Sequence, residues 1–189
     1  MIPLGQAMGG WRTRRERNPP APWRWPASVG RGRYDMPNSH HYAADLEWTG
    51  AAHGPTADYR GYSREFTLRL PGKAELRGSS DPHFVGDPAL HNPEDLLLAA
   101  VASCHLLSWL SLCARHKVRV LTYRDTPEAT MAWNGETFAF TEAVLHPRAT
   151  IQVGDDVAAA LALHHEAHRL CFIARSVTFP IRCEPLVTS

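Results

Sequence analysis

A long apolar segment with its own start signal is the feature that most constrains this chain. Asn92-Pro93-Glu94-Asp95 precedes an apolar run over residues 96–112. Asparagine can cap a helix, proline suits the first helical position, and two carboxylates complement the positive end of the helix dipole. We therefore predict a helix from residue 92 to about residue 117, where basic residues suit its C-terminal end. Its apolar residues cover more than one stripe, which predicts burial on most sides.

A second helix is predicted from Asp155-Asp156 to about Cys171. Apolar and polar residues alternate on either side of the two helices, and turn residues separate these runs, as is typical of strands. The predicted strands cover residues 41–48, 62–70, 118–124, 128–133, 138–153 (with a turn at 146–147) and 176–183. Residues 71–91 are predicted to form a long loop. Strands grouped before and after the helices indicate an α+β fold.

The first 37 residues differ in composition from the rest of the chain. Arginine, proline and tryptophan are interleaved there, and proline at this density disfavours both helices and central strands. We predict a disordered extension over residues 1–37 and one globular domain over residues 38–189. Met36 could itself be the initiating residue.

The bulk composition excludes several classes of protein. A net charge of +1 favours neither nucleic-acid binding nor membrane-surface binding. No apolar run approaches the roughly 20 residues of a membrane span, so the segment at 96–112, which polar residues interrupt, is interpreted as a core helix. The four cysteines are widely spaced and form no CxxC pair, and no secretory signal is visible. The expected compartment is therefore the reducing cytoplasm.

Two cysteines lie in settings typical of a redox centre. Cys104 is inside the first predicted helix, ten residues after Glu94, and Cys171 ends the second. A buried cysteine is usually only a small apolar side chain, and burial raises its pKa, so a reactive Cys104 needs a nearby cation. Glu94 lies about 15 Å away along the helix axis, too far to touch the sulfur but able to hold an arginine. Arg60 and Arg64 are the candidates, because a guanidinium is always charged and matches a carboxylate.

These residues resemble the motifs of a known family. Asn92-Pro93-Glu94-Asp95-Leu96, with Cys104 ten residues after the glutamate, resembles the motif of the OsmC/Ohr family. His168-Arg169-Leu170-Cys171 followed by Phe-Ile-Ala-Arg-Ser is also similar to it, and the resemblance covers roughly residues 40–185. Ohr members usually carry proline after the second cysteine, whereas this chain has Phe172, which indicates a divergent branch.

The resemblance implies a role for each residue of the site. Cys104 would be the peroxidatic cysteine, Cys171 the resolving cysteine and Glu94 the anchor of the activating arginine, with Arg60 preferred to Arg64. The implied fold is OsmC-like α+β, with antiparallel sheets wrapped around two long central helices in an intertwined homodimer. The implied activity is reduction of organic hydroperoxides through a Cys104–Cys171 disulfide, in oxidative stress defence. A lipoyl-type dithiol or another thiol would be the reductant, and no cofactor or metal is implied.

The alternative is a protein that binds a metal or small ligand without turnover. His164 and His168 are spaced i, i+4 and Cys171 lies three residues further, so the three share one helix face. Imidazole and thiolate ligands suit zinc. An ordinary polar or interface-lining stripe accounts for the same spacing, and we rank the redox interpretation above the metal site.

The sequence assigns no catalytic role to His105, Cys113 or Cys183. His105 points about 100° away from its neighbour Cys104 and is a poor candidate base, so a cysteine hydrolase lacks its histidine. Cys113 faces the opposite side of the helix from Cys104 and is predicted to pack in the core. Cys183 ends a predicted strand and has no predicted role.

Overall fold

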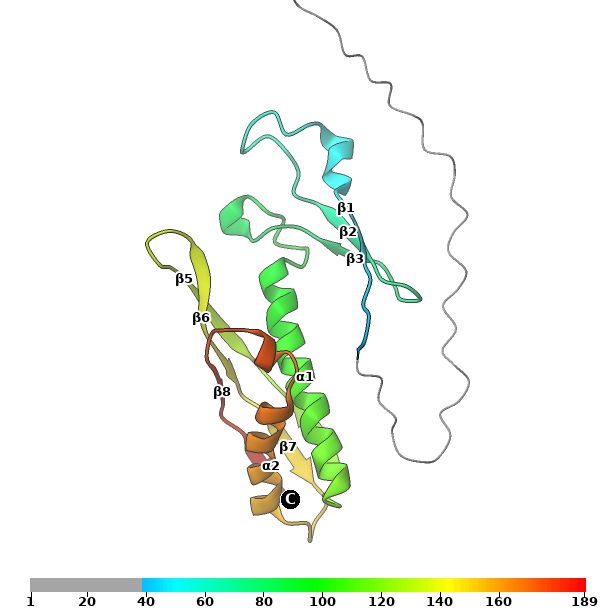
Figure 1. Cartoon of the computed structure of the whole chain (residues 1–189), viewed down its shortest axis with the longest axis vertical. Coiled ribbons are helices and arrows are strands. Elements are labelled where there is room, and N and C mark those ends of the chain that lie inside the picture. Colours follow the sequence, from blue (N-terminus) through cyan, green and yellow to red (C-terminus); the bar gives the residue numbers. More distant parts are fainter. Residues whose placement is uncertain (1–38) are drawn as a thin grey trace, which may run out of the picture.

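The computed structural model describes residues 39–189, so the extension predicted over residues 1–37 lies outside the described range. Two helices and three small sheets make up this part of the chain (Figure 1). The strands and helices in chain order are β1 (Asp45–Glu47), β2 (Phe66–Arg69), β3 (Leu76–Gly78), α1 (Pro93–Arg115), β4 (Val120–Arg124), β5 (Glu128–Trp133), β6 (Phe138–Leu145), β7 (Arg148–Ile151), α2 (Val157–Leu170), β8 (Ile181–Cys183) and β9 (Leu186–Thr188). Strands precede and follow the helices, which confirms the predicted α+β class.

Helix α1 begins where its sequence signal predicts. The Asn92 side chain accepts a hydrogen bond of 2.7 Å from the Asp95 backbone N–H, and the Asp95 carboxylate accepts one of 3.4 Å from the Asn92 N–H. This reciprocal capping box satisfies donors that the first helical turn leaves free. The helix ends at Arg115, and Lys117 then adopts a left-handed φ of 62° that turns the chain into β4.

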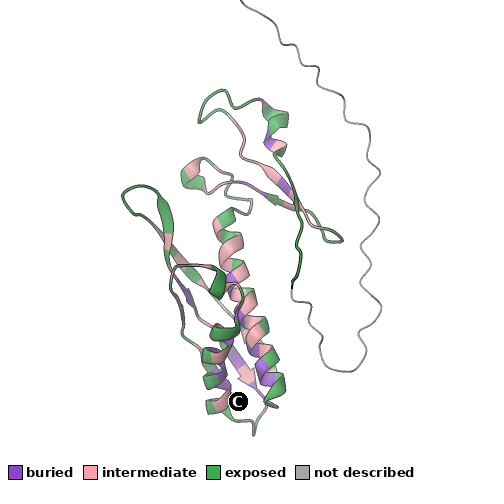
Figure 2. Ribbon diagram, viewed as in Figure 1, coloured by how far each residue is buried: buried purple, intermediate pink, exposed green. Residues whose placement is uncertain are grey.

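Helix α2 packs against α1 to form the core. Asp156 caps α2 by accepting a hydrogen bond of 2.9 Å from the Ala159 N–H. Side chains from both helices and from β7 and β9 meet in one buried cluster, which consists of Trp109, Leu112, Cys113, Val118, Ala149, Ile151, Ala160, Leu163, Ala167 and Val187. Buried residues are concentrated where the C-terminal half of α1 lies beside α2 and β7 (Figure 2). The predicted packing role of Cys113 is confirmed, because it is 1% exposed.

The three sheets are rich in antiparallel pairs but are not purely antiparallel. Their orders are β1-β2-β3, β4-β7-β9 and β5-β6-β8. Neighbouring strands joined by short turns pair antiparallel, whereas β8 pairs parallel with β6 and β9 pairs parallel with β7. Strands β8 and β9 follow α2, and a helical crossover is the connection that returns a strand in the parallel direction. This corrects the expectation of antiparallel sheets alone.

Several predicted strand boundaries were wrong. The segment predicted as a loop over residues 71–91 contains β3, which pairs with β2 through a turn at Gly72, where φ is 72°. Strand β9 was not predicted, and the strands predicted over 41–48 and 176–183 shorten to β1 and β8. These strands have three residues each, too few for an alternating pattern to stand out in the sequence.

Helix α1 is less covered than its sequence predicts. It is 23 residues long and, by length and composition, could cross a membrane, which corrects the expectation that no segment is long enough. Only 28% of its most apolar window is buried within the chain, and Leu107 is 67% exposed. The shorter α2 lies beside the C-terminal half of α1, and the sheet β1-β2-β3 lies near its N-terminal end (Figure 1). One side of α1 therefore lacks a partner within the described chain.

Candidate functional site

The structure brings Cys104 and Cys171 together. Cys104 lies in the middle of α1 and is half-buried, while Cys171 is the C-terminal cap of α2 and is 1% exposed. The two thiols lie close enough to influence each other's protonation, and both are free. Because α1 packs along α2, two residues far apart in the sequence meet where the second helix ends.

Cys171 is held as a protonated thiol. Burial raises the pKa of Cys171 to about 11, and the hydrogen bond with Cys104 contributes in the same direction. The Ala174 N–H donates to the Cys171 sulfur over 3.4 Å, which lowers the pKa but does not offset burial. A thiol with such a pKa carries almost no thiolate at neutral pH and is a poor first nucleophile. Of the two adjacent sulfurs, Cys104 is therefore the better candidate for attack.

Glu94 presents an unpaired carboxylate oxygen. Its side chain leaves the first turn of α1, and its Oε2 atom is buried without a hydrogen-bond partner among the described residues. A buried carboxylate oxygen without a partner is costly, so such a position favours a cation or another donor. Glu94 lies about 15 Å from Cys104 along the helix, so it can influence the thiol only through a bridging group.

Neither candidate arginine forms an ion pair with Glu94 within the described chain. Arg64 donates to the backbone carbonyls of Tyr59 and Tyr62, and its guanidinium lies 3.8 Å from the centre of the Tyr62 ring. Arg60 is exposed, and only its backbone N–H forms a hydrogen bond, to the Asp58 carboxylate. Arg64 is therefore engaged by its own loop, whereas the guanidinium of Arg60 has no partner among residues 39–189.

An apolar pocket of about 290 Å³ lies beside the start of α1. Its lining includes the aromatic side chains of Trp48, Tyr62 and Phe66, together with Arg64 and Pro93. Pro93 neighbours Glu94, so the pocket adjoins the carboxylate rather than the thiols. Cys104 lies eleven positions after Pro93 on α1, or about 16 Å along the axis. Within one chain, the pocket and the thiol pair are therefore separate sites.

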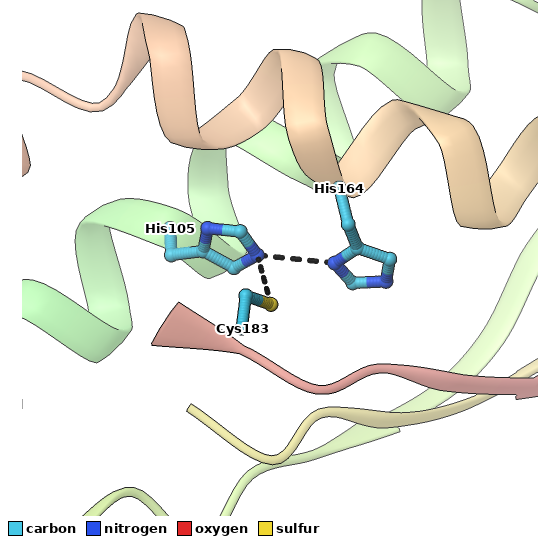
Figure 3. A group of neighbouring side chains, drawn as sticks. All are labelled: His105, His164 and Cys183. Atoms are coloured by element: carbon cyan, nitrogen blue, oxygen red, sulfur yellow. Dashed lines mark hydrogen bonds between the residues drawn. The ribbon is translucent and has the colours of Figure 1, made fainter. Parts of the chain in front are cut away.

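The metal cluster expected at His164, His168 and Cys171 does not form in the described chain. His164 instead meets His105 and Cys183, residues to which sequence reasoning assigned no such role (Figure 3). His164 points into the helix pair toward His105, whereas Cys171 lies beside Cys104 at the end of α2, so the spacing along the helix does not bring the three ligand atoms together. No sequence signal pointed to this group, because its members are 59 and 78 residues apart.

Comparisons with known proteins bear on the family and the fold of this chain. A family model described as OsmC-like protein matches residues 86–185, and no curated protein matches the chain. An OsmC-like protein of unknown function from Vibrio cholerae is 28% identical, with a TM-score of 0.72 over 78% of this chain and 100% of that chain. An organic hydroperoxide resistance protein from Elizabethkingia anophelis is 18% identical, with a TM-score of 0.59 over 82% and 99%. A Legionella pneumophila protein described in the same way is 18% identical, with a TM-score of 0.57 over 79% and 98%.

Proposed function

Because this chain belongs to the OsmC-like family, we propose that it is a thiol-dependent peroxidase that reduces organic hydroperoxides to alcohols. The observation that carries the proposal is the contact between the half-buried Cys104 and the buried Cys171. Two relatives of the same fold are described as organic hydroperoxide resistance proteins, which supports this substrate class. The proposed physiological role is defence against oxidative stress, in the cytoplasm.

The proposed reaction has three steps. The Cys104 thiolate attacks the O–O bond of the hydroperoxide; the sulfur takes one oxygen and becomes a sulfenic acid, and the other oxygen leaves as an alcohol after protonation. The Cys171 thiol then condenses with the sulfenic acid, forming a disulfide and releasing water. A dithiol reductant, of lipoyl or similar type, finally exchanges with the disulfide and returns both thiols while being oxidised itself.

The environments of the two sulfurs support this division of roles. Burial keeps Cys171 protonated, so it does not compete for the peroxide. The same thiol is already adjacent to the position where the sulfenic acid would form, which shortens the time that the sulfenic acid is exposed to further oxidation. No conformational change that separates the two helices is required for the second step.

Mass spectrometry of peptides after hydroperoxide treatment tests the proposal. One equivalent of cumene hydroperoxide is expected to convert the reduced protein to a form with a Cys104–Cys171 disulfide. Cys171→Ser is expected to stop at a Cys104 sulfenic acid, which a dimedone-type reagent traps, because the resolving thiol is gone. Hydroperoxide consumption without this disulfide, or a disulfide that involves Cys113 or Cys183 instead, would contradict the proposed mechanism.

Arg60 is the arginine that we assign to activation of Cys104. Its guanidinium is exposed and forms no hydrogen bond or ion pair among residues 39–189. Glu94 has an unpaired carboxylate oxygen that would orient it. We expect Arg60→Gln to slow the first step about a hundredfold, because removing one fixed electrostatic donor typically has an effect of this size. Arg64→Gln is the matched control and is expected to stay within a few-fold of wild type. Single-turnover rates of sulfenic acid formation measure both, and the reverse ranking would transfer the role to Arg64.

We also propose that the chain functions as an intertwined homodimer. The uncovered apolar side of α1 supports this, since exposed apolar patches of this kind favour association. A second subunit would cover α1 and shield the region between the pocket and the thiols from water. Unfolding measured at several protein concentrations tests the dimer, because the unfolding midpoint of a dimer rises with protein concentration.

A further inference from the structure

A second cluster of chemically active side chains lies inside the helix pair, apart from the redox cysteines. His105 of α1, His164 of α2 and Cys183 of β8 point toward one another (Figure 3). The His105 Nε2 atom is 3.0 Å from His164 Nδ1 and 3.5 Å from the Cys183 sulfur, and all three atoms lie within 4.8 Å of one another. Three elements that are distant in the sequence thus supply two imidazoles and one thiol to a single point.

The surroundings hold both imidazoles in place and keep them neutral. His105 is 1% exposed and His164 is 2% exposed. The His164 ring lies between His105 and Trp109, stacked on the Trp109 ring at 4.5 Å between centres. Burial lowers the pKa of His105 to about 4 and that of His164 to about 3, so each ring keeps a lone pair at neutral pH. Neutral, fixed imidazoles are the form of histidine that binds metals.

A hydrogen-bonded histidine pair alone accounts poorly for the cluster. One N–H can satisfy the contact between the two rings, yet His105 Nδ1 and His164 Nε2 remain buried without a partner among the described residues. A metal on the two facing nitrogens would leave both of these atoms as N–H groups, so they do not bear on the choice between a histidine pair and a metal site. The Cys183 sulfur lies 3.5 Å from His105 Nε2, the same nitrogen that faces His164. A hydrogen-bonded histidine pair does not require this third group.

The spacing of the three atoms matches a metal coordination sphere. Zinc bound tetrahedrally at about 2.0–2.1 Å from nitrogen and about 2.3 Å from sulfur separates two nitrogens by about 3.3 Å, and a nitrogen from a sulfur by about 3.6 Å. The observed 3.0 Å and 3.5 Å are close to these values, and the third separation, from His164 Nδ1 to the Cys183 sulfur, is within 4.8 Å, so binding needs a movement of the side chains toward one centre. Imidazole and thiolate are both ligand types that zinc uses, and three such ligands leave the fourth position of a tetrahedral site open.

We propose that His105 Nε2, His164 Nδ1 and Cys183 Sγ bind one zinc(II) ion or a divalent transition metal of similar preference. The metal displaces the thiol proton of Cys183, which leaves with solvent, and the thiolate becomes the third ligand. The negative charges of Asp125 and Glu184 lie near the Cys183 sulfur and favour a cation there. This site differs from the one the sequence suggested, as only His164 is common to the two sets.

A bound metal would crosslink α1, α2 and β8. His105 directly follows Cys104, and His164 lies on the helix that ends at Cys171. Fixing the two histidines on one ion fixes the register of the two helices that carry the redox thiols. The site is nevertheless independent of peroxide chemistry, so a chain without peroxidase activity can still bind the metal.

Cobalt(II) titration of the reduced, chelator-treated full chain tests the site. We expect one equivalent to bind, with a thiolate-to-cobalt charge-transfer band, because the ligand set includes one sulfur. A matched series of Cys→Ser variants at 104, 113, 171 and 183 locates that sulfur. The band is expected to be lost in Cys183→Ser and kept in the other three. Absence of stoichiometric binding, or loss of the band in Cys104→Ser or Cys171→Ser with retention in Cys183→Ser, overturns the proposal.

Alkylation of the wild-type protein provides a test that needs no variant. Zinc at one equivalent is expected to slow iodoacetamide modification of Cys183 at least tenfold, while Cys104 is modified at an unchanged rate. Peptide mass spectrometry measures the two sites in the same sample. Equal protection of all cysteines, or no protection of Cys183, overturns the proposal even if Cys183→Ser fails to fold.

Discussion

Replacing Cys104 by serine is expected to reduce hydroperoxide turnover by at least about a thousandfold. Serine keeps the shape of the side chain, but its hydroxyl is not ionised at neutral pH and is a far weaker nucleophile than a thiolate. No other cysteine can substitute, because burial raises the pKa of Cys113, Cys171 and Cys183 to about 11 or 12. Steady-state consumption of cumene hydroperoxide with a dithiol reductant measures the loss.

Cys113→Ala is the matched control for Cys104→Ser. Cys113 lies on the same helix but faces the core, where it belongs to one buried cluster with Trp109 and Leu163. Its removal leaves a small cavity and a modest loss of stability, with turnover unchanged in the folded protein. Equal activity losses for both variants would indicate a general folding defect, and unchanged activity in Cys104→Ser would exclude it as the peroxidatic residue.

Trp109→Ala is expected to destabilise the fold by about 3–5 kcal/mol. The indole is fully buried between α1 and α2, stacks on the His164 ring, and donates a hydrogen bond of 3.0 Å to the Ala160 carbonyl. Alanine would leave a large cavity at the centre of the helix pair, which the surrounding chains cannot fill without moving. A loss of this size is a substantial part of the stability of a domain this small.

Urea unfolding of metal-free protein measures the effect of Trp109→Ala. Trp133→Ala is the matched control, because the Trp133 side chain is 57% exposed in β5 and its removal is expected to cost less than about 1 kcal/mol. Measurements at several protein concentrations also test the homodimer, since the midpoint of a dimer rises with concentration. Equal losses for the two tryptophans would contradict the assigned core, and a constant midpoint would contradict the dimer.

The two helices were predictable because their signals are local. Asn92 and Asp95 form the capping box within one turn, so the start of α1 depends only on neighbouring residues. Asp156 likewise caps α2 one residue before its first turn. Strands β3 and β9 escaped prediction because three residues carry almost no periodic pattern, and their pairing partners, β2 and β7, lie elsewhere in the chain.

The candidate site likewise has some features that local sequence signals indicate and others that depend on the fold. The ten-residue offset from Glu94 to Cys104 and the position of Cys171 at a helix end are sequence facts, and the resemblance of these motifs to the OsmC/Ohr family nominated both thiols. The sequence preferred Arg60 to Arg64, although the two occupy one loop, and the contacts of Arg64 with its tyrosines support Arg60 as the proposed arginine. The alternative His164–His168–Cys171 group does not form because His164 pairs with His105 inside the helix pair while Cys171 lies beside Cys104, which helical spacing alone does not show.

The sequence by itself determined the long capped apolar helix, the second helix and the cysteine on each of them. Capping and periodicity act over a few residues, so they can be read without knowing the fold. Only the tertiary structure decided which side of α1 stays uncovered, that Cys104 and Cys171 are neighbours, and that His105, His164 and Cys183 converge. These contacts join residues 59 to 78 positions apart and depend on how α1 packs against α2 and β8, which no local pattern encodes.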